Sequence, residues 1–331
     1  MPAKSTSKNN KHLINYLRLS VTDRCNLRCI YCMPSEGLKF MPHSNILSYE
    51  EMLYIVQLAV TTGIRKVRLT GGEPLVRKGI IGFLKRLNKI EGLEEITLTT
   101  NGVLLKRFAA DIKECGIKRI NVSMDSLKPE RFFYITKRDY FEQVWEGIRE
   151  AERLGFYPIK INVVAIKGFN DDEILDFARL TIDKPYHIRF IEFMPVGEEI
   201  GWSYNRFIST GEIYDTIKQL SDLKPVTSLA LDGPAERFIL EGGKGEIGFI
   251  GALSNHFCDK CNRMRLTAEG RLRGCLFSDE EIDIKTPLRE GKSDSYLFKL
   301  FRLAGENKPG HPELMAPERR KCARNMSSIG G

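Results

Sequence analysis

The sequence predicts an α/β fold: a parallel sheet curled into an incomplete (β/α)6 TIM-like barrel, with a small C-terminal α+β extension closing the barrel mouth. Strand-like runs alternate with helix-length segments six times before about residue 195. Helical crossovers join parallel strands, and eight such units close a barrel, so six units leave it open on one side. Beyond residue 195 the pattern changes to short alternating runs separated by glycine turns.

The β-branched and alternating runs of the first part predict its strands. The six predicted strands are Tyr16–Val21, Lys66–Thr70, Glu95–Thr100, Arg119–Met124, Ile159–Ile166 and His187–Met194. Ser48 and Glu51 form a capping-box pattern that predicts a helix, and Gly63 is expected to end it. Gly116 and Gly155 end two later helices in the same way.

Three regions are therefore expected: a flexible leader over 1–14, a partial barrel over 15–195, and a C-terminal region over 196–331. In the last region, the runs Arg237–Leu240 and Glu246–Ile250 predict a small antiparallel appendage. Gly243–Gly248 satisfies the pattern G-x-G-x-x-G. A strand-like run follows it and no helix begins there, so it is a turn between two strands and not a dinucleotide site.

The amino-acid composition limits which kinds of function the protein can have. The chain has 331 residues, 42% hydrophobic content, eight cysteines and a formal net charge of +8. We expect neither a signal peptide nor a membrane-spanning segment, hence a cytoplasmic protein whose clustered cysteines serve a metal or catalysis. The charge suits nucleic acid or an anionic small substrate. The basic residues are scattered, without a basic arm interleaved with aromatics, so we expect no nucleic acid partner.

Cys25, Cys29 and Cys32 follow the spacing Cys-x3-Cys-x2-Cys, which lets three sulfurs converge on one point. Three thiolates favour an iron–sulfur cluster of four irons that keeps one iron open to a small molecule. Zinc would need a fourth ligand from elsewhere, and spacing alone leaves a closed zinc site or a disulfide loop as alternatives.

This motif, with Tyr31 inside it, resembles the S-adenosylmethionine radical (radical SAM) family. The resemblance implies a 4Fe-4S cluster that binds S-adenosyl-L-methionine, on the same incomplete barrel. It also assigns the turn Gly71-Gly72-Glu73-Pro74 to the methionine amino group, although two glycines after a strand alone indicate only a tight turn. Ser123 and Met194 match positions that line the cofactor; spacing alone would indicate strand-end packing.

A second group of three cysteines, Cys258, Cys261 and Cys275, lies in the C-terminal region. Alone it is equally consistent with a zinc ribbon completed by His256 or by a distant thiol. Beside the first motif, a second open-sided 4Fe-4S cluster is the better interpretation. Between these cysteines, Arg263-Met264-Arg265 places two guanidiniums on one side of a strand, which is typical of a phosphate clamp.

Both cysteine groups, the arginine motif and the terminal Gly330-Gly331 together resemble the GTP 3′,8-cyclases of molybdenum cofactor biosynthesis, over about residues 17–331. The resemblance implies that a 5′-deoxyadenosyl radical abstracts the ribose 3′-hydrogen of GTP and that the second cluster holds the guanine. It implies an electron donor, a downstream cyclic pyranopterin monophosphate synthase, and a tail that enters the barrel mouth; a homodimer stays open. The residues assigned to GTP are Arg18, Lys66, Arg68, Thr99, Lys160, Arg189, Arg263, Met264, Arg265, Gly330 and Gly331.

Three alternatives remain at this point. A radical SAM peptide maturase with an auxiliary cluster would share both cysteine groups but would not need Arg263 and Arg265. A zinc-stabilised nucleic-acid-binding protein would use the positive charge, and would bind with a strong salt dependence. An electron carrier would not need so long a chain. Cys115, expected to be a packed thiol, and Cys322 match no motif.

Overall fold

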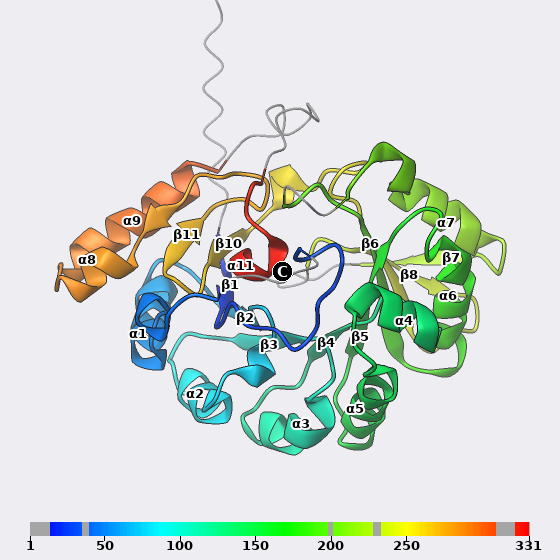
Figure 1. Ribbon diagram of the computed structural model, residues 1–331, viewed down its shortest axis with the longest axis horizontal. Helices are drawn as coiled ribbons and strands as arrows, with labels where there is room; N and C mark the ends of the chain where they lie inside the picture. Colours follow the sequence, from blue (N-terminus) through cyan, green and yellow to red (C-terminus); the bar gives the residue numbers. More distant parts are fainter. Residues whose placement is uncertain (1–13, 35–39, 198–200, 228–232, 309–321, 331) are drawn as a thin grey trace, which may run out of the picture.

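The computed structural model describes residues 14–34, 40–197, 201–227, 233–308 and 322–330. They form one curved sheet of twelve strands in the order β12-β11-β10-β1-β2-β3-β4-β5-β6-β9-β8-β7. The helices α1 to α9 lie around its outer, convex side, and α11 lies inside the curve (Figure 1). The two edges of the sheet are not joined by hydrogen bonds within this order, so the predicted incomplete barrel is confirmed.

The six predicted strands all form, and they pair in parallel in chain order. Their bounds are β1 Tyr16–Ser20, β2 Lys66–Thr70, β3 Glu95–Thr100, β4 Ile120–Ser123, β5 Ile159–Ala165 and β6 Tyr186–Glu192. The helices after them are α1 Tyr49–Thr61, α2 Ile80–Leu87, α3 Leu105–Glu114, α4 Pro129–Thr136, α5 Phe141–Arg153, α6 Ile174–Asp183 and α7 Thr210–Lys218. Predicted and observed strand ends differ by at most two residues.

The predicted helix ends are confirmed. Ser48 accepts a hydrogen bond from the Glu51 amide while Glu51 accepts one from the Ser48 amide, so α1 begins at a complete capping box. Gly63, Gly116 and Gly155 follow α1, α3 and α5 with positive φ angles, the conformation in which glycine reverses the chain after a helix.

The C-terminal strands do not form a separate unit, because they extend both edges of the main sheet. Their bounds are β7 Leu223–Val226, β8 Glu236–Leu240, β9 Glu246–Ile250, β10 Arg263–Leu266, β11 Arg271–Arg273 and β12 Ile282–Asp283. β8 and β9 are antiparallel as predicted, but β9 also pairs in parallel with β6, and β10 pairs in parallel with β1. The helices α8 Lys285–Arg289, α9 Asp294–Glu306 and α11 Met326–Ile329 complete the described chain.

Side-chain alternation separates two environments. Leu17 and Leu19 of β1 face the helices and join the large hydrophobic core. Tyr16 and Arg18 alternate with them and face the inside of the curve, in register with Arg263 and Arg265 of β10. The neighbouring β2 repeats this pattern with Lys66 and Arg68. The concave face of the sheet is therefore polar and positively charged, and it is the face on which the site lies.

Candidate active site

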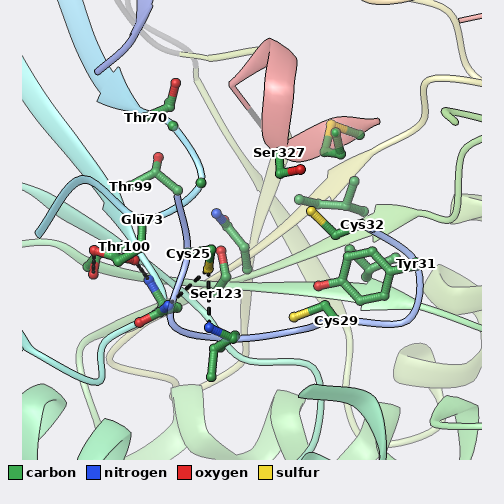
Figure 2. Close-up of a pocket in the computed structure, with 18 of the residues that line it drawn as sticks. Cys25, Cys29, Tyr31, Cys32, Thr70, Glu73, Thr99, Thr100, Ser123 and Ser327 are labelled. Atoms are coloured by element: carbon green, nitrogen blue, oxygen red, sulfur yellow. Dashed lines mark hydrogen bonds between the residues drawn. The ribbon is translucent and has the colours of Figure 1, made fainter. Parts of the chain in front are cut away.

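A cavity of about 220 Å³ occupies the inside of the barrel at the carboxyl ends of its strands. Its walls come from the first cysteine loop, the strand ends of β1 to β6, β10 and the C-terminal α11 (Figure 2). Parallel barrels carry their chemistry at this end, because the loops that follow the strands converge there. The predicted site residues that line it are Arg18, Cys25, Cys29, Tyr31, Cys32, Arg68, Gly71, Gly72, Glu73, Thr99, Ser123, Met194 and Arg265.

The first cysteine loop brings its three thiols to this cavity. The amides of Cys32 and Met33 both donate to the Cys29 carbonyl, at 2.9 and 3.2 Å, and form the turn between the last two cysteines. Cys25 accepts hydrogen bonds from the Leu27 amide at 3.4 Å and from Asn101 Nδ2 at 3.7 Å. Burial, and then the neighbouring Cys25, raise the pKa of the Cys32 thiol to about 12.

The turn Gly71-Gly72 packs against the cysteine loop. The Gly72 amide donates to the Thr22 carbonyl and the Glu73 amide to the Arg24 carbonyl, both at 2.8 Å. A Cβ at Gly72 would lie 2.3 Å from the Arg24 carbonyl oxygen, and one at Gly71 would lie 2.6 Å from that of Thr22. The resemblance assigns these glycines to the cofactor. In the structure they allow the backbone of the turn to approach the cysteine loop closely, and this contact holds the loop in place.

The side chain of Glu73 is bound by the protein itself and is not available to a ligand. Its carboxylate is buried and accepts hydrogen bonds from the Thr100 hydroxyl and from the amides of Asn101 and Leu75. Burial raises the pKa of Glu73 to about 7, although these three donors act in the opposite direction. The side chain therefore joins the turn to the end of β3, and only its backbone remains for a cofactor.

Tyr31 is fixed by Asp125, which follows β4. The tyrosine hydroxyl donates to Asp125 Oδ2 at 2.5 Å, and Asp125 Oδ1 accepts from the Val164 amide at 2.8 Å. Burial raises the pKa of Asp125 to about 6. This pair connects the cysteine loop with β5 and lies beside Ser123 on the cavity wall.

Buried arginines lie at the cavity, where Arg68 and Arg265 line it, and beside it, where Arg189 lies. Arg68, Arg189 and Arg265 are at most 8% exposed. Within the described part of the chain their hydrogen-bond partners are neutral: Arg68 donates to Thr97, Arg189 to Asn121 and Arg265 to the Gly330 carbonyl. Burial, and then the neighbouring Arg263, lower the pKa of Arg265 to about 10, and burial with Arg68 lowers that of Arg189 to about 9. Clustered buried positive charge of this kind favours a polyanion.

Several predicted substrate residues do not line the main cavity. Lys66 forms an ion pair of 2.7 Å with Glu95, and Arg263 lies 4.8 Å from the centre of the Phe257 ring. Lys160 and Arg189 line a second, smaller hollow near the amino ends of β5 and β6. Met264 is buried in the hydrophobic core, on the opposite face of β10 from Arg265, so its side chain does not face the substrate region.

The second cysteine group lies next to β10. Cys258 and Cys261 occupy a short 3₁₀ turn before this strand, and Cys275 follows β11. Burial, and then Cys275 and Cys261, raise the pKa of Cys258 to about 11. At Cys261 burial acts in the same direction, but the positive charges of Arg263 and Lys308 outweigh it and lower the pKa to about 6. The effects of Cys275 and Cys261 on the pKa of Cys258 indicate that the three thiols lie near one another.

The end of the chain enters the barrel. Ile329 and Ser327 are buried, and Gly330 lies where its added Cβ would meet Thr70 Oγ1 at 2.5 Å. The Gly330 carbonyl accepts a hydrogen bond of 2.6 Å from Arg265. Gly331, also assigned to the substrate, lies outside the described residues, as do residues 1–13 of the expected leader.

Some residues of the site were not predicted from the sequence. Asn101, Asp125 and Asn162 line the cavity, as does Thr70. A polar residue at or just after the end of a predicted barrel strand was the available signal for Thr70, Asn101 and Asp125, whereas Asn162 lies within β5 and has no such signal. The two remaining cysteines are buried: Cys115 ends α3 as a packed thiol, and Cys322 contacts Arg273.

The donor set fits the cofactors that the motif implies. Among the described residues, Thr70 Oγ1, Thr99 Oγ1 and Asn162 Oδ1 are buried at the cavity and have no hydrogen-bond partner, as expected where a polar ligand supplies one. Three thiols on one wall are the ligands that an iron–sulfur cluster uses. Within the described residues, no three His, Cys, Asp or Glu side chains are grouped around the position of a single metal ion.

Comparison with known proteins identifies the family. Residues 19–181 match the Radical SAM superfamily, and residues 186–313 match Molybdenum Cofactor Synthesis C. A GTP 3′,8-cyclase of Moorella thermoacetica is 50% identical over 318 residues, which cover 96% of this chain and 98% of that protein. One of Thermodesulfovibrio yellowstonii is 51% identical over 324 residues, with the same coverage. This chain belongs to the GTP 3′,8-cyclase family.

Membership confirms the radical SAM assignment made from the cysteine spacing, and with it a 4Fe-4S cluster and S-adenosylmethionine. Among solved structures, Streptococcus suis SuiB bound to S-adenosylmethionine matches with a TM-score of 0.59 at 16% identity, covering 88% of this chain and 68% of that one. SuiB bound to its precursor peptide SuiA matches with a TM-score of 0.62 at 15% identity, covering 91% and 68%. These likenesses show the fold alone. No helix in the described ranges is long and apolar enough to cross a membrane.

Proposed function

We propose that this member of the GTP 3′,8-cyclase family converts GTP into (8S)-3′,8-cyclo-7,8-dihydroguanosine 5′-triphosphate, the first step of molybdenum cofactor biosynthesis. The observation that carries the proposal is the meeting of two features at one cavity. Three thiols form one wall, and the guanidiniums of Arg18, Arg68 and Arg265 form another. GTP needs both features, because the guanidiniums bind its triphosphate and the thiols would hold the cluster that starts the reaction at its ribose.

Cys25, Cys29 and Cys32 would hold a 4Fe-4S cluster. When bound, that cluster supplies the electron that cleaves S-adenosylmethionine and releases a 5′-deoxyadenosyl radical. The turn Gly71-Gly72 and the residues Ser123 and Met194 line the space beside these thiols, and we assign them to the cofactor. Tyr31 contributes by positioning the loop through Asp125.

The arginines hold and orient the triphosphate. Arg68 and Arg265 are buried without a carboxylate partner within the described residues, so a phosphate gains charge-assisted hydrogen bonds there and relieves the mutual repulsion of the arginines. Thr99 offers a buried hydroxyl on the same wall. Lys66, Lys160, Arg189 and Arg263 lie further along the concave face and would contact the outer phosphates.

The second cysteine group would hold the other 4Fe-4S cluster, which we assign to the guanine base. Lys308 donates to the Cys261 carbonyl at 2.5 Å, and the positive charge of Arg263 favours the Cys261 thiolate. The cavity also has apolar walls at Phe193, Leu276 and Met326, which exclude water from the reacting atoms.

The remaining expectations are part of the proposal. We expect a cytoplasmic enzyme that receives electrons from a reducing donor and passes its product to a cyclic pyranopterin monophosphate synthase, without nucleic acid or a membrane. The division of the chain at residues 195 and 196 is kept as proposed, close to the point between residues 181 and 186 where the two family matches meet.

The test is anaerobic. Reconstituted protein receives S-adenosylmethionine and a strong reductant, and 5′-deoxyadenosine is quantified with GTP, with ATP and without nucleotide. We expect formation stimulated by GTP and accompanied by a cyclised guanine product. If 5′-deoxyadenosine forms at the same rate with and without nucleotide, the result would instead support the peptide maturase. A colourless zinc protein with salt-dependent nucleic acid affinity would support the nucleic-acid-binding alternative.

A further inference from the structure

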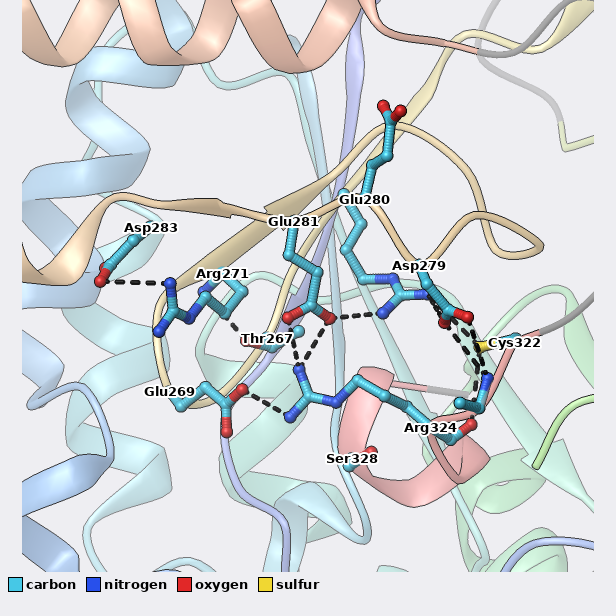
Figure 3. A network of polar contacts seen from close by, with 12 residues as sticks. Thr267, Glu269, Arg271, Asp279, Glu280, Glu281, Asp283, Cys322, Arg324 and Ser328 are labelled. Atoms are coloured by element: carbon cyan, nitrogen blue, oxygen red, sulfur yellow. Dashed lines mark hydrogen bonds and ion pairs between the residues drawn. The ribbon is translucent and has the colours of Figure 1, made fainter. Parts of the chain in front are cut away.

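Arg324 ties the start of the C-terminal tail, residues 322–330, to two carboxylates on the body of the protein (Figure 3). One terminal nitrogen of its guanidinium donates to both oxygens of Glu281, at 2.7 and 2.9 Å. The other donates to Glu269 at 2.5 Å. The side chain of Arg324 is 25% exposed and those of the two glutamates less than 20%, so these ion pairs are largely shielded from solvent.

The carboxylate of Glu281 is shared with a second arginine. Arg273 is fully buried and donates to Glu281, to the Ser278 carbonyl and, at 3.3 Å, to the sulfur of Cys322. Arg273 and Glu281 flank the loop that carries Cys275. The tail and the loop of the second cysteine group therefore share one buried polar network.

Backbone contacts reinforce the same junction. The Gly197 amide donates to the Cys322 carbonyl at 2.9 Å, and the Ala323 amide donates to Asp279 at 3.2 Å. Beyond Arg324 the chain forms α11, whose Met326 and Ser327 line the cavity, and Arg265 donates to the Gly330 carbonyl at the end of this helix. The tail is thus fixed at two points, the network of Arg324 outside the cavity and Arg265 within it.

We propose that Arg324 is a positioning residue for the reaction: through Glu281 and Glu269 it anchors the tail so that Gly330 reaches Arg265 in the cavity. The role in the reaction rests on the proposed function, but the anchoring does not. Without Arg324, Glu269 loses the one ion-pair partner that it has within the described residues, and the base of the tail keeps the contacts of Cys322 and Ala323 but no ion pair. An unanchored tail leaves the cavity more often, because the loss of two charge-assisted contacts removes the restraint on its base.

The direct test measures access to the chain end. Reconstituted protein without substrate is treated anaerobically with carboxypeptidase, and removal of the terminal glycines is followed by intact mass. We expect Arg324→Gln to be trimmed about tenfold faster than the wild type, equivalent to about 1.4 kcal/mol of tail anchoring. The matched control is Arg302→Gln, which removes an exposed arginine paired with Glu306 on α9 and should be trimmed at the wild-type rate.

Two milder variants keep the test decisive if Arg324→Gln fails to fold. Arg324→Lys retains the charge but cannot reach both glutamates with separate nitrogens, and Glu269→Gln removes one contact; both should be trimmed at intermediate rates. Iron content should match the wild type in each. Equal trimming of all variants would overturn the proposal, whatever the substrate proves to be. If trimming rises as expected and GTP is the substrate, kcat for cyclisation should fall while the affinity for S-adenosylmethionine stays unchanged; an unchanged kcat would reject the positioning role.

Discussion

Arg265 donates a hydrogen bond of 2.6 Å to the carbonyl oxygen of Gly330, although the two residues come from a sheet strand and from the chain end. The same guanidinium belongs to the group that we assign to the triphosphate. The tail and the substrate therefore meet on one side chain. Through this contact, the position of Gly330 would affect the proposed chemistry inside the barrel.

Replacing Arg265 should separate cyclisation from cluster assembly. Arg265→Ala removes a buried charge that serves both the tail and the proposed phosphate site. We expect kcat/KM for GTP to fall by roughly a hundredfold, as when a charge-assisted hydrogen bond worth about 1.5–3 kcal/mol is lost. Iron content should remain that of the wild type. Full activity in a variant with both clusters would contradict the assignment of Arg265.

Gly330 should tolerate no side chain. A Cβ there would lie 2.5 Å from Thr70 Oγ1 and 3.1 Å from Ser20 Cβ, and its φ of +78° is unfavourable for other residues. Gly330→Ala is therefore expected to displace the tail and abolish cyclisation while both clusters survive. Gly291→Ala is the matched control, since that glycine has a φ of +70° and open space around it. Comparable activity in the two variants would show that the fit of Gly330 is unimportant.

Gly72 should be required for the first cluster. Its Cβ would meet the Arg24 carbonyl at 2.3 Å, so Gly72→Ala must push the cysteine loop away from the turn. We expect the reconstituted variant to lose roughly half of its iron and acid-labile sulfide, the share of one cluster in two. Gly82→Ala, on α2 with no neighbour within 4 Å, should bind the wild-type amount. A normal iron content in Gly72→Ala would disprove this packing role.

Because buried arginines line the cavity, we expect polyphosphate to stabilise the protein against unfolding even when no reaction takes place. Inorganic tripolyphosphate should raise the thermal unfolding midpoint, and a concentration of 100 times Kd corresponds to about 2.7 kcal/mol. Guanosine, which lacks phosphate, should have a much smaller effect. Arg68→Gln should weaken the response, because Arg68 is among the buried arginines at the cavity. Equal stabilisation by guanosine and tripolyphosphate would contradict an anion clamp.

Asp125 predicts a defined pH dependence of stability. Burial raises its pKa to about 6 in the folded protein, against a usual value of 3.8. Between these values the folded state binds more protons than the unfolded state, so this residue lowers the free energy of unfolding as pH rises from 4 to 7. As pH rises from 4 to 7, the free energy of unfolding of Asp125→Asn should increase by on the order of 2–3 kcal/mol relative to that of the wild type. Urea unfolding of the metal-free protein measures this difference. A constant difference would show that Asp125 does not titrate in this range.

The sequence was sufficient where spacing or periodicity encodes the structure. Cys25, Cys29 and Cys32 could be assigned together because they lie in one loop, and the strands β1 to β6 follow from alternating runs. Arg263 and Arg265 were placed on one face by the same alternation, and their side of β10 is confirmed by its register with Tyr16 and Arg18.

Long-range contacts were beyond such reasoning. β9 and β10 are short, and nothing local indicates that they pair in parallel with β6 and β1. Met264 was included with its arginine neighbours, although alternation directs it to the core. The contacts of Gly330 with Arg265 and of Arg324 with Glu281 join residues far apart in the sequence, and only the folded chain brings them together.

The most direct test of the proposed reaction uses GTP that carries deuterium at the ribose 3′ position. Reconstituted protein, S-adenosylmethionine and reductant are incubated anaerobically, and the 5′-deoxyadenosine formed is analysed by mass spectrometry. The proposal predicts that one deuterium appears in 5′-deoxyadenosine and that GTP labelled at the 2′ position transfers none. Transfer from the 2′ position, or 5′-deoxyadenosine without deuterium from 3′-labelled GTP, would contradict it.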